Sequence, residues 1–73
     1  MMTHYEIIII YEKEYGEVIG FATKEYMNDS NDIVTHAIRL GLIEKQYRDR
    51  VRWARAISEY EFEYVKFGWR YDV

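Results

Sequence analysis

Residues 4 to 27, with the sequence HYEIIIIYEKEYGEVIGFATKEYM, decide the fold of this 73-residue chain. The first eight of these residues, 4–11, form a short segment rich in β-branched and aromatic side chains. This composition predicts a short strand. A single strand is not stable alone, so it must pair with a second strand of the same chain or with its copy in another subunit. The residues that follow it therefore determine the architecture.

Two interpretations compete for that following segment. In one, Tyr15 and Gly16 form a hairpin turn and residues 17–22 are a second strand. In the other, residues 13–27 are a helix, because apolar side chains recur at helical spacing: Tyr15, Val18, Ile19, Ala22 and Tyr26. We favour the helix, although Gly16 and Gly20 each cost it about 1 kcal/mol relative to alanine. A monomeric hairpin packed on two helices remains the alternative.

The second half of the chain predicts two further helices. Asp29 and Asp32 lie in a cluster of turn formers and resemble a helix cap, and an apolar stripe then runs from Ile33 to Leu42. Helical spacing from Tyr47 predicts a third helix to about residue 64. Period-two alternation over residues 60–64 leaves helix or strand open for residues 59–67.

Size and composition predict one domain over residues 1–73 and an association between copies. A chain this small buries little surface, and without cysteine it has no disulfide to stabilise it. The 49% hydrophobic and 18% aromatic content exceeds what a monomer easily hides, so we expect a homodimer. No apolar run is long enough to cross a membrane and the first residues lack a signal-peptide pattern, which predicts an intracellular protein without a membrane partner.

The segment from Asp29 to Leu42, DSNDIVTHAIRLGL, resembles the second helix of ribbon-helix-helix proteins in its aliphatic, Ala37 and Arg39 positions, although Ser30 replaces the usual arginine. The resemblance implies a mainly α homodimer in which one strand from each subunit forms a ribbon, with the core at residues 4–44. Residues 45–73 are then an added C-terminal helical extension. The chain also resembles small ribbon-helix-helix proteins of spindle-shaped viruses that infect hyperthermophilic archaea, which implies the cytoplasm of the host cell.

The same resemblance places the ribbon in the DNA major groove and the start of the second helix on phosphate. With the other face of the strand in the core, the ribbon presents four residues to the groove: His4, Glu6, Ile8 and Ile10. The phosphate contacts fall on Ser30 and Asn31. The predicted dimer core comprises Ile7, Ile9, Tyr11, Val18, Ile19, Ala22, Ile33, Val34, Ala37, Ile38 and Leu42. Glu6 departs from the family, because a carboxylate is repelled by phosphate.

Basic residues are concentrated in one block of a chain whose formal net charge is -3. This predicted basic patch comprises Lys45, Arg48, Arg50, Arg52 and Arg55. It either contacts phosphates or forms a solvated helix face. Trp53 and Trp69 are expected to pack in the core rather than to stack on bases.

Two function classes follow from these features. The first is a dimeric regulator that binds double-stranded DNA, and the second is a dimeric scaffold that binds another protein. We predict no enzyme, no cofactor and no metal site, because no catalytic, phosphate-loop or zinc-ligand spacing is present.

Overall fold

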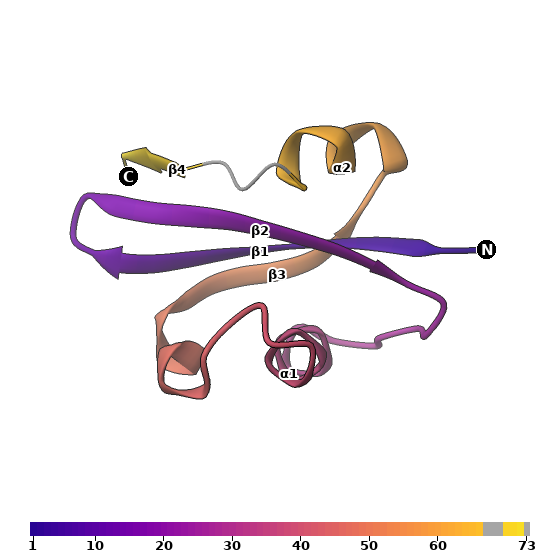
Figure 1. Ribbon diagram of the computed structural model, residues 1–73, viewed down its shortest axis with the longest axis horizontal. Helices are drawn as coiled ribbons and strands as arrows, with labels where there is room; N and C mark the ends of the chain where they lie inside the picture. Colours follow the sequence, from indigo (N-terminus) through magenta and orange to yellow (C-terminus); the bar gives the residue numbers. More distant parts are fainter. Residues whose placement is uncertain (67–69, 73) are drawn as a thin grey trace.

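A computed structural model describes residues 1–66 and 70–72 and shows an antiparallel sheet with one α-helix on each face (Figure 1). Three long strands, β1 (Thr3–Glu12), β2 (Tyr15–Thr23) and β3 (Val51–Ile57), are joined by the short β4 (Arg70–Asp72). Their order in the sheet is β3-β1-β2-β4. The prediction of a mainly α ribbon-helix-helix fold is therefore wrong.

The predicted helix over residues 13–27 is wrong, because residues 15–23 are the strand β2. The alternative of a hairpin is correct, but its turn lies at residues 13–14, and Tyr15 and Gly16, expected in the turn, are paired with Glu12 and Ile10. β1 and β2 form a hairpin in which Ile7 lies opposite Ile19 and Glu6 opposite Gly20. Gly20 sits where a helix packs on the sheet, with the side chains of Phe62 and Val65 too close to leave room for a Cβ atom. The close approach of this helix explains why residue 20 is a glycine. On sequence alone, Gly20 served only as an argument against a helix over residues 13–27.

The prediction of a strand at residues 4–11 is confirmed, but its pairing is not the predicted one. β1 lies between β2 and β3 of its own chain, so both of its edges are already hydrogen-bonded. No edge of β1 is left to pair with a copy from another subunit. The ribbon of the predicted homodimer is therefore excluded by the sheet itself.

The helix α1 (Ser30–Arg39) begins and ends where local chemistry directs. The carboxylate of Asp29 accepts a hydrogen bond from the backbone amide of Asp32, which confirms the predicted cap. At the other end Gly41 adopts φ 78°, and the amides of Gly41 and Leu42 bond back to Ile38 and Ala37. This is a Schellman ending, so the helix stops before Leu42.

The predicted third helix is replaced by three elements: a 3₁₀ helix η1 (Lys45–Arg50), β3 and the short helix α2 (Glu59–Val65). The helical extension over residues 45–73 is thus wrong for β3 and β4, which are strands, and right for residues 59–64. A capping box starts α2, because Ser58 and Glu61 each accept the other's backbone amide. This fixes the open choice for residues 59–65 as helix, while residue 67 and Trp69 lie outside the described residues.

The sheet carries a hydrophobic cluster on each face. The larger one lies under α1 and includes the fully buried Tyr5, Ile7 and Ile9 of β1. The smaller one lies under α2 and is built from Ile8, Val18 and Val65.

The residues predicted for a dimer core are distributed over both clusters of a single chain. Ile7, Ile9, Ile33, Val34 and Ala37 are buried in the larger cluster, and the partly buried Tyr11, Ile19 and Ile38 pack against it. Val18 faces α2 instead, Ala22 is half-buried, and Leu42 is exposed because α1 ends before it.

Candidate nucleic-acid interface

The basic residues predicted from the sequence lie together along one edge of the sheet. Lys45, Arg48 and Arg50 belong to η1, and Arg52 and Arg55 belong to β3. All five are exposed. β3 is the outermost strand on this side, so only one of its two edges is paired within the described sheet. We call these five residues the basic edge.

Most of the positive charge on the basic edge is not neutralised internally. Within the part of the chain that the structure describes, four of its members have no carboxylate oxygen within 4.0 Å: Lys45, Arg48, Arg50 and Arg52. Arg48 donates to the hydroxyl of Thr35 at 3.0 Å, and Arg50 donates to the backbone carbonyl of Tyr11 at 3.3 Å. These neutral acceptors orient the two guanidinium groups without cancelling their charge, so the charge remains available to an external anion.

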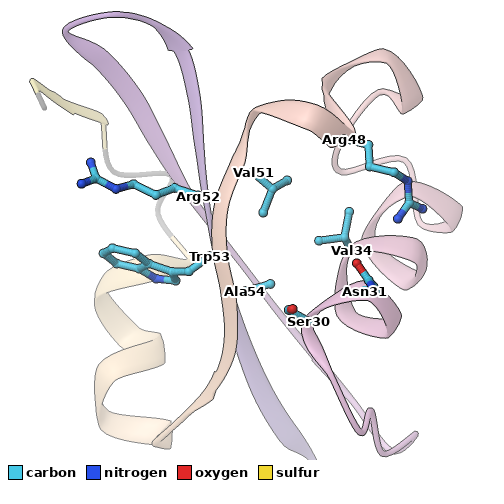
Figure 2. Close-up of a pocket in the computed structure, with 8 residues that line it drawn as sticks. All are labelled: Ser30, Asn31, Val34, Arg48, Val51, Arg52, Trp53 and Ala54. Atoms are coloured by element: carbon cyan, nitrogen blue, oxygen red, sulfur yellow. The ribbon is translucent and has the colours of Figure 1, made fainter.

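A β-bulge in β3 sets the direction of the side chains beside this edge. Trp53 lies opposite Ile8, but Val51 lies opposite Ile9, so Arg52 is an extra residue between two paired positions. Figure 2 shows the side chains of Arg52 and Trp53 leaving β3 on the same side, away from Val51. The bulge therefore brings a cation and an aromatic ring together on one face of the edge strand.

A shallow depression of about 150 Å³ separates β3 from α1 (Figure 2). Its lining residues are Ser30, Asn31, Val34, Arg48, Val51, Arg52, Trp53 and Ala54. The two residues predicted to contact phosphate, Ser30 and Asn31, thus share this depression with Arg48, while the side chain of Arg52 turns to the other side of β3 (Figure 2). The structure brings together residues that the sequence assigned to separate contacts.

Trp53 is held in place by two side chains of the same face. Its indole Nε1 donates to the carboxylate of Glu6 at 3.3 Å, and the guanidinium of Arg55 lies over its ring, 5.5 Å from the centroid. Arg55 also forms an ion pair with Glu6, with Nε and Oε1 at 2.5 Å. Trp53 nevertheless remains 41% exposed, so it presents a fixed aromatic surface to the outside.

The four residues predicted to enter the DNA groove do share one face of β1, but α2 and neighbouring side chains cover it. His4 packs against Phe62 of α2, with ring centroids 4.7 Å apart. Glu6 and Ile8 are buried, and Ile10 is partly buried against the smaller hydrophobic cluster. The assignment of these residues to a DNA-reading ribbon is therefore wrong, because β1 is the central strand and not a free ribbon.

Tyr11 lies at the end of β1 that is next to η1, and its environment opposes ionisation. Burial raises the pKa of Tyr11 to about 12 from 10.0, and the nearby carboxylate of Glu17 contributes to this rise by accepting the phenolic hydrogen bond and by its charge. The hydroxyl donates to Glu17 at 3.0 Å. Tyr11 therefore stays neutral over the physiological pH range.

Trp53 was the functional residue that the sequence interpretation placed wrongly. The stretch from Trp53 to Ile57 alternates between the larger Trp53, Arg55 and Ile57 and the small Ala54 and Ala56, which is the period of a strand. Hydrophobicity does not alternate clearly along this stretch, because the face of β3 that carries Arg55 also carries Trp53. The alternation of large and small residues would have indicated the strand and placed Trp53 on the face opposite Ala54.

No protein-family model matches this chain, and no curated protein and no solved structure is similar enough to it to count as a match. Among the described residues, none of the helices has the length and apolar character needed to cross a bilayer. The same residues contain no group of three or more histidine, cysteine or carboxylate side chains that could hold a metal ion. The function must therefore be inferred from the geometry and charge of the surface.

Proposed function

We propose that this protein binds DNA through the basic edge. The observation that carries the proposal is the concentration of four exposed cations without carboxylate partners, among the described residues, in η1 and at the start of the edge strand β3 of a chain with 13 acidic and 10 basic side chains. Clustered arginine and lysine side chains attract the phosphate backbone and release its counterions, which supplies sequence-independent affinity.

The proposal keeps DNA as the partner but moves the interface away from the predicted ribbon. In the ribbon arrangement the carboxylate of Glu6 faced phosphate and opposed binding. In the basic edge the same carboxylate is buried and paired with Arg55, so it does not project towards the ligand. The strongest electrostatic objection to DNA binding therefore does not apply to this surface.

Contacts from the basic edge predict a measurable salt dependence. Four phosphate contacts give a slope of about -3 to -4 in a plot of log affinity against log salt concentration. Raising the salt from about 50 to about 200 mM then weakens binding by roughly 10²-fold. Affinity of this kind positions a protein on DNA, and a preference for particular fragments would be needed for a role in transcription regulation.

The test is a fluorescence-anisotropy titration of the full chain against pooled genomic fragments at several salt concentrations. In the variant Arg48→Gln/Arg52→Gln, we expect weaker binding and a salt slope reduced by about 2. The matched control is Lys13→Gln/Lys24→Gln, which removes the same charge from two positions outside the basic edge. An equal loss of DNA affinity in both variants would mean that only the net charge matters, which would contradict the proposal.

Binding of fragments with a reproducible preference would support the regulatory role. No salt-dependent binding to any fragment would overturn the DNA proposal, and the alternative of a protein-interaction scaffold would then direct the search towards protein partners.

A further inference from the structure

We infer that the basic edge takes single-stranded DNA in preference to the duplex, with Trp53 as the platform on which a base stacks. The inference rests on the proposed function, because it names the form of DNA that the same surface binds. It depends on three features that the charge of the edge alone does not explain: the fixed indole ring, the thickness of the body behind the edge and the placement of cations on both sides of it.

The first feature is the preorganisation of Trp53. A side chain that is 41% exposed on an edge strand ordinarily retains rotational freedom, but here Glu6 holds the indole nitrogen and Arg55 lies over the ring. Ordering a flexible side chain upon binding costs free energy, and a ring that is already held avoids that cost. Such a ring suits base stacking, which tolerates any sequence because every base has a π-face.

The second feature is the thickness of the molecule around the basic edge. The major groove of B-DNA is about 12 Å wide and accepts an isolated helix or a two-stranded ribbon. β3 instead packs against α1 on one face of the sheet, and α2 covers the neighbouring strands β1 and β2 on the other face (Figure 1), in a body whose three extents are all 18 Å or more. The edge strand does not enter the groove as an isolated ribbon does, so Trp53 meets bases more readily on a single strand than in the stack of a duplex.

The third feature is the distribution of charge about β3. Arg52 leaves the strand on the side of Trp53, whereas Arg48 lies across the depression on the side of α1 (Figure 2). A single flexible backbone that follows the edge of β3 left unpaired in the described sheet receives cations from both sides while its bases turn towards Trp53. The paired strands of a duplex hold their bases in the stack and leave only phosphates for this surface.

The experiment compares one labelled single strand of about 20 nucleotides and mixed sequence with the same strand annealed to its complement. Anisotropy titrations of the full chain at low salt give the two affinities for each variant. We expect the wild type to bind the single strand at least about tenfold more tightly than the duplex. Trp53→Ala is expected to weaken single-strand binding by about 5- to 150-fold, the effect of losing one base stack, and to leave duplex binding unchanged.

Two further variants keep the test decisive. Trp53→Phe retains an aromatic ring and is expected to keep most of the single-strand affinity, and circular dichroism checks that both Trp53 variants are folded. Tyr60→Ala is the matched control, because Tyr60 is an aromatic residue of α2 that is 73% exposed and lies outside the basic edge. It is expected to bind both probes as the wild type does.

A direct signal comes from Trp69→Phe, in which Trp53 is the remaining tryptophan of the sequence. Stacking predicts quenching of its fluorescence by the single strand and none by the duplex.

The outcomes separate this inference from the proposal on which it rests. Equal or tighter binding of the duplex, an unchanged affinity in Trp53→Ala, or absent quenching in Trp69→Phe would overturn the stacking platform while the basic edge remained the DNA-binding surface. Loss of affinity for both probes in Arg48→Gln/Arg52→Gln would support that surface in each case. Absence of salt-dependent binding to either probe would overturn the proposed function and this inference together.

Discussion

Replacing Gly20 with alanine tests whether the packing of α2 on the sheet requires a glycine in β2. A Cβ atom at this position would lie 2.5 Å from Cγ1 of Val65 and 3.1 Å from both Cε2 of Phe62 and Cβ of Val65. The first distance is far inside van der Waals contact, so either Val65 or the whole of α2 must move. α2 has seven residues, and its one buried side chain is Val65, the residue that the new Cβ atom would displace.

The expected loss follows from two opposing effects. Overpacking a well-packed site costs about 1 to 3 kcal/mol. Replacing glycine with alanine also restricts the unfolded chain and stabilises the fold by about 0.4 to 1 kcal/mol where the backbone permits it. We therefore expect Gly20→Ala to lower the free energy of unfolding by about 1 to 2 kcal/mol, a large fraction of the total for a chain of this size.

A second substitution identifies the cause of that loss. Val65→Ala removes the atom that the new Cβ would meet, and alone it costs about 1.6 kcal/mol for two buried methyl groups. In the double variant the two changes compensate, because the methyl group added at position 20 occupies space that the valine side chain has vacated. Urea unfolding of the two single variants and the double variant should give a coupling free energy of about 1 kcal/mol or more. Strictly additive losses would refute the argument that Gly20 is required by close contact with α2.

Two further predictions concern local chemistry. Because the pKa of the Tyr11 phenol is about 12 when folded and near 10.0 when unfolded, the folded state holds its proton longer and stability is lost as the pH rises through this window. Free energies of unfolding measured at about pH 9 and about pH 11 should fall more steeply for the wild type than for Tyr11→Phe, and identical slopes would contradict this assignment. Asp29→Ala removes the acceptor of the Asp32 amide and should lower stability by about 0.5 to 2 kcal/mol in thermal unfolding, whereas Asp29→Asn should retain most of it. A loss in Asp29→Asn as large as in Asp29→Ala would argue against the cap.

Local signals were sufficient for the elements that local chemistry controls. The run of β-branched residues at 4–11 marked β1, and Asp29 marked the start of α1, because strand propensity and capping act within a few residues. The clustering of the five basic residues could be predicted for the same reason, since they are close in sequence, but their place in η1 and on the edge strand β3 could not, because a helix was expected there.

The hairpin could not be decided in this way, because residues 15–26 satisfy the helical period while residues 17–22 also suit a strand. What separates the two is Gly20, which must admit α2 from a distant part of the sequence. From one sequence it is not possible to tell whether a glycine such as Gly20 weakens a helix or is required by a contact with a distant segment. The helix was therefore favoured because the sequence does not show the contact between Gly20 and α2, which decides between the two interpretations.

The consequence of placing β1 correctly is clearest at Glu6. On a free ribbon a carboxylate faces solvent or phosphate, and it then argues against DNA as a ligand. Once β1 is the central strand, the same side chain is 10% exposed and must be paired, since a buried charge without a partner is strongly destabilising. Its partners, Arg55 and Trp53, come from the edge strand, so the requirement to satisfy Glu6 fixes how that edge presents a cation and an aromatic ring. The residue that opposed DNA binding in the predicted fold is thus the one that positions the proposed interface in the observed one.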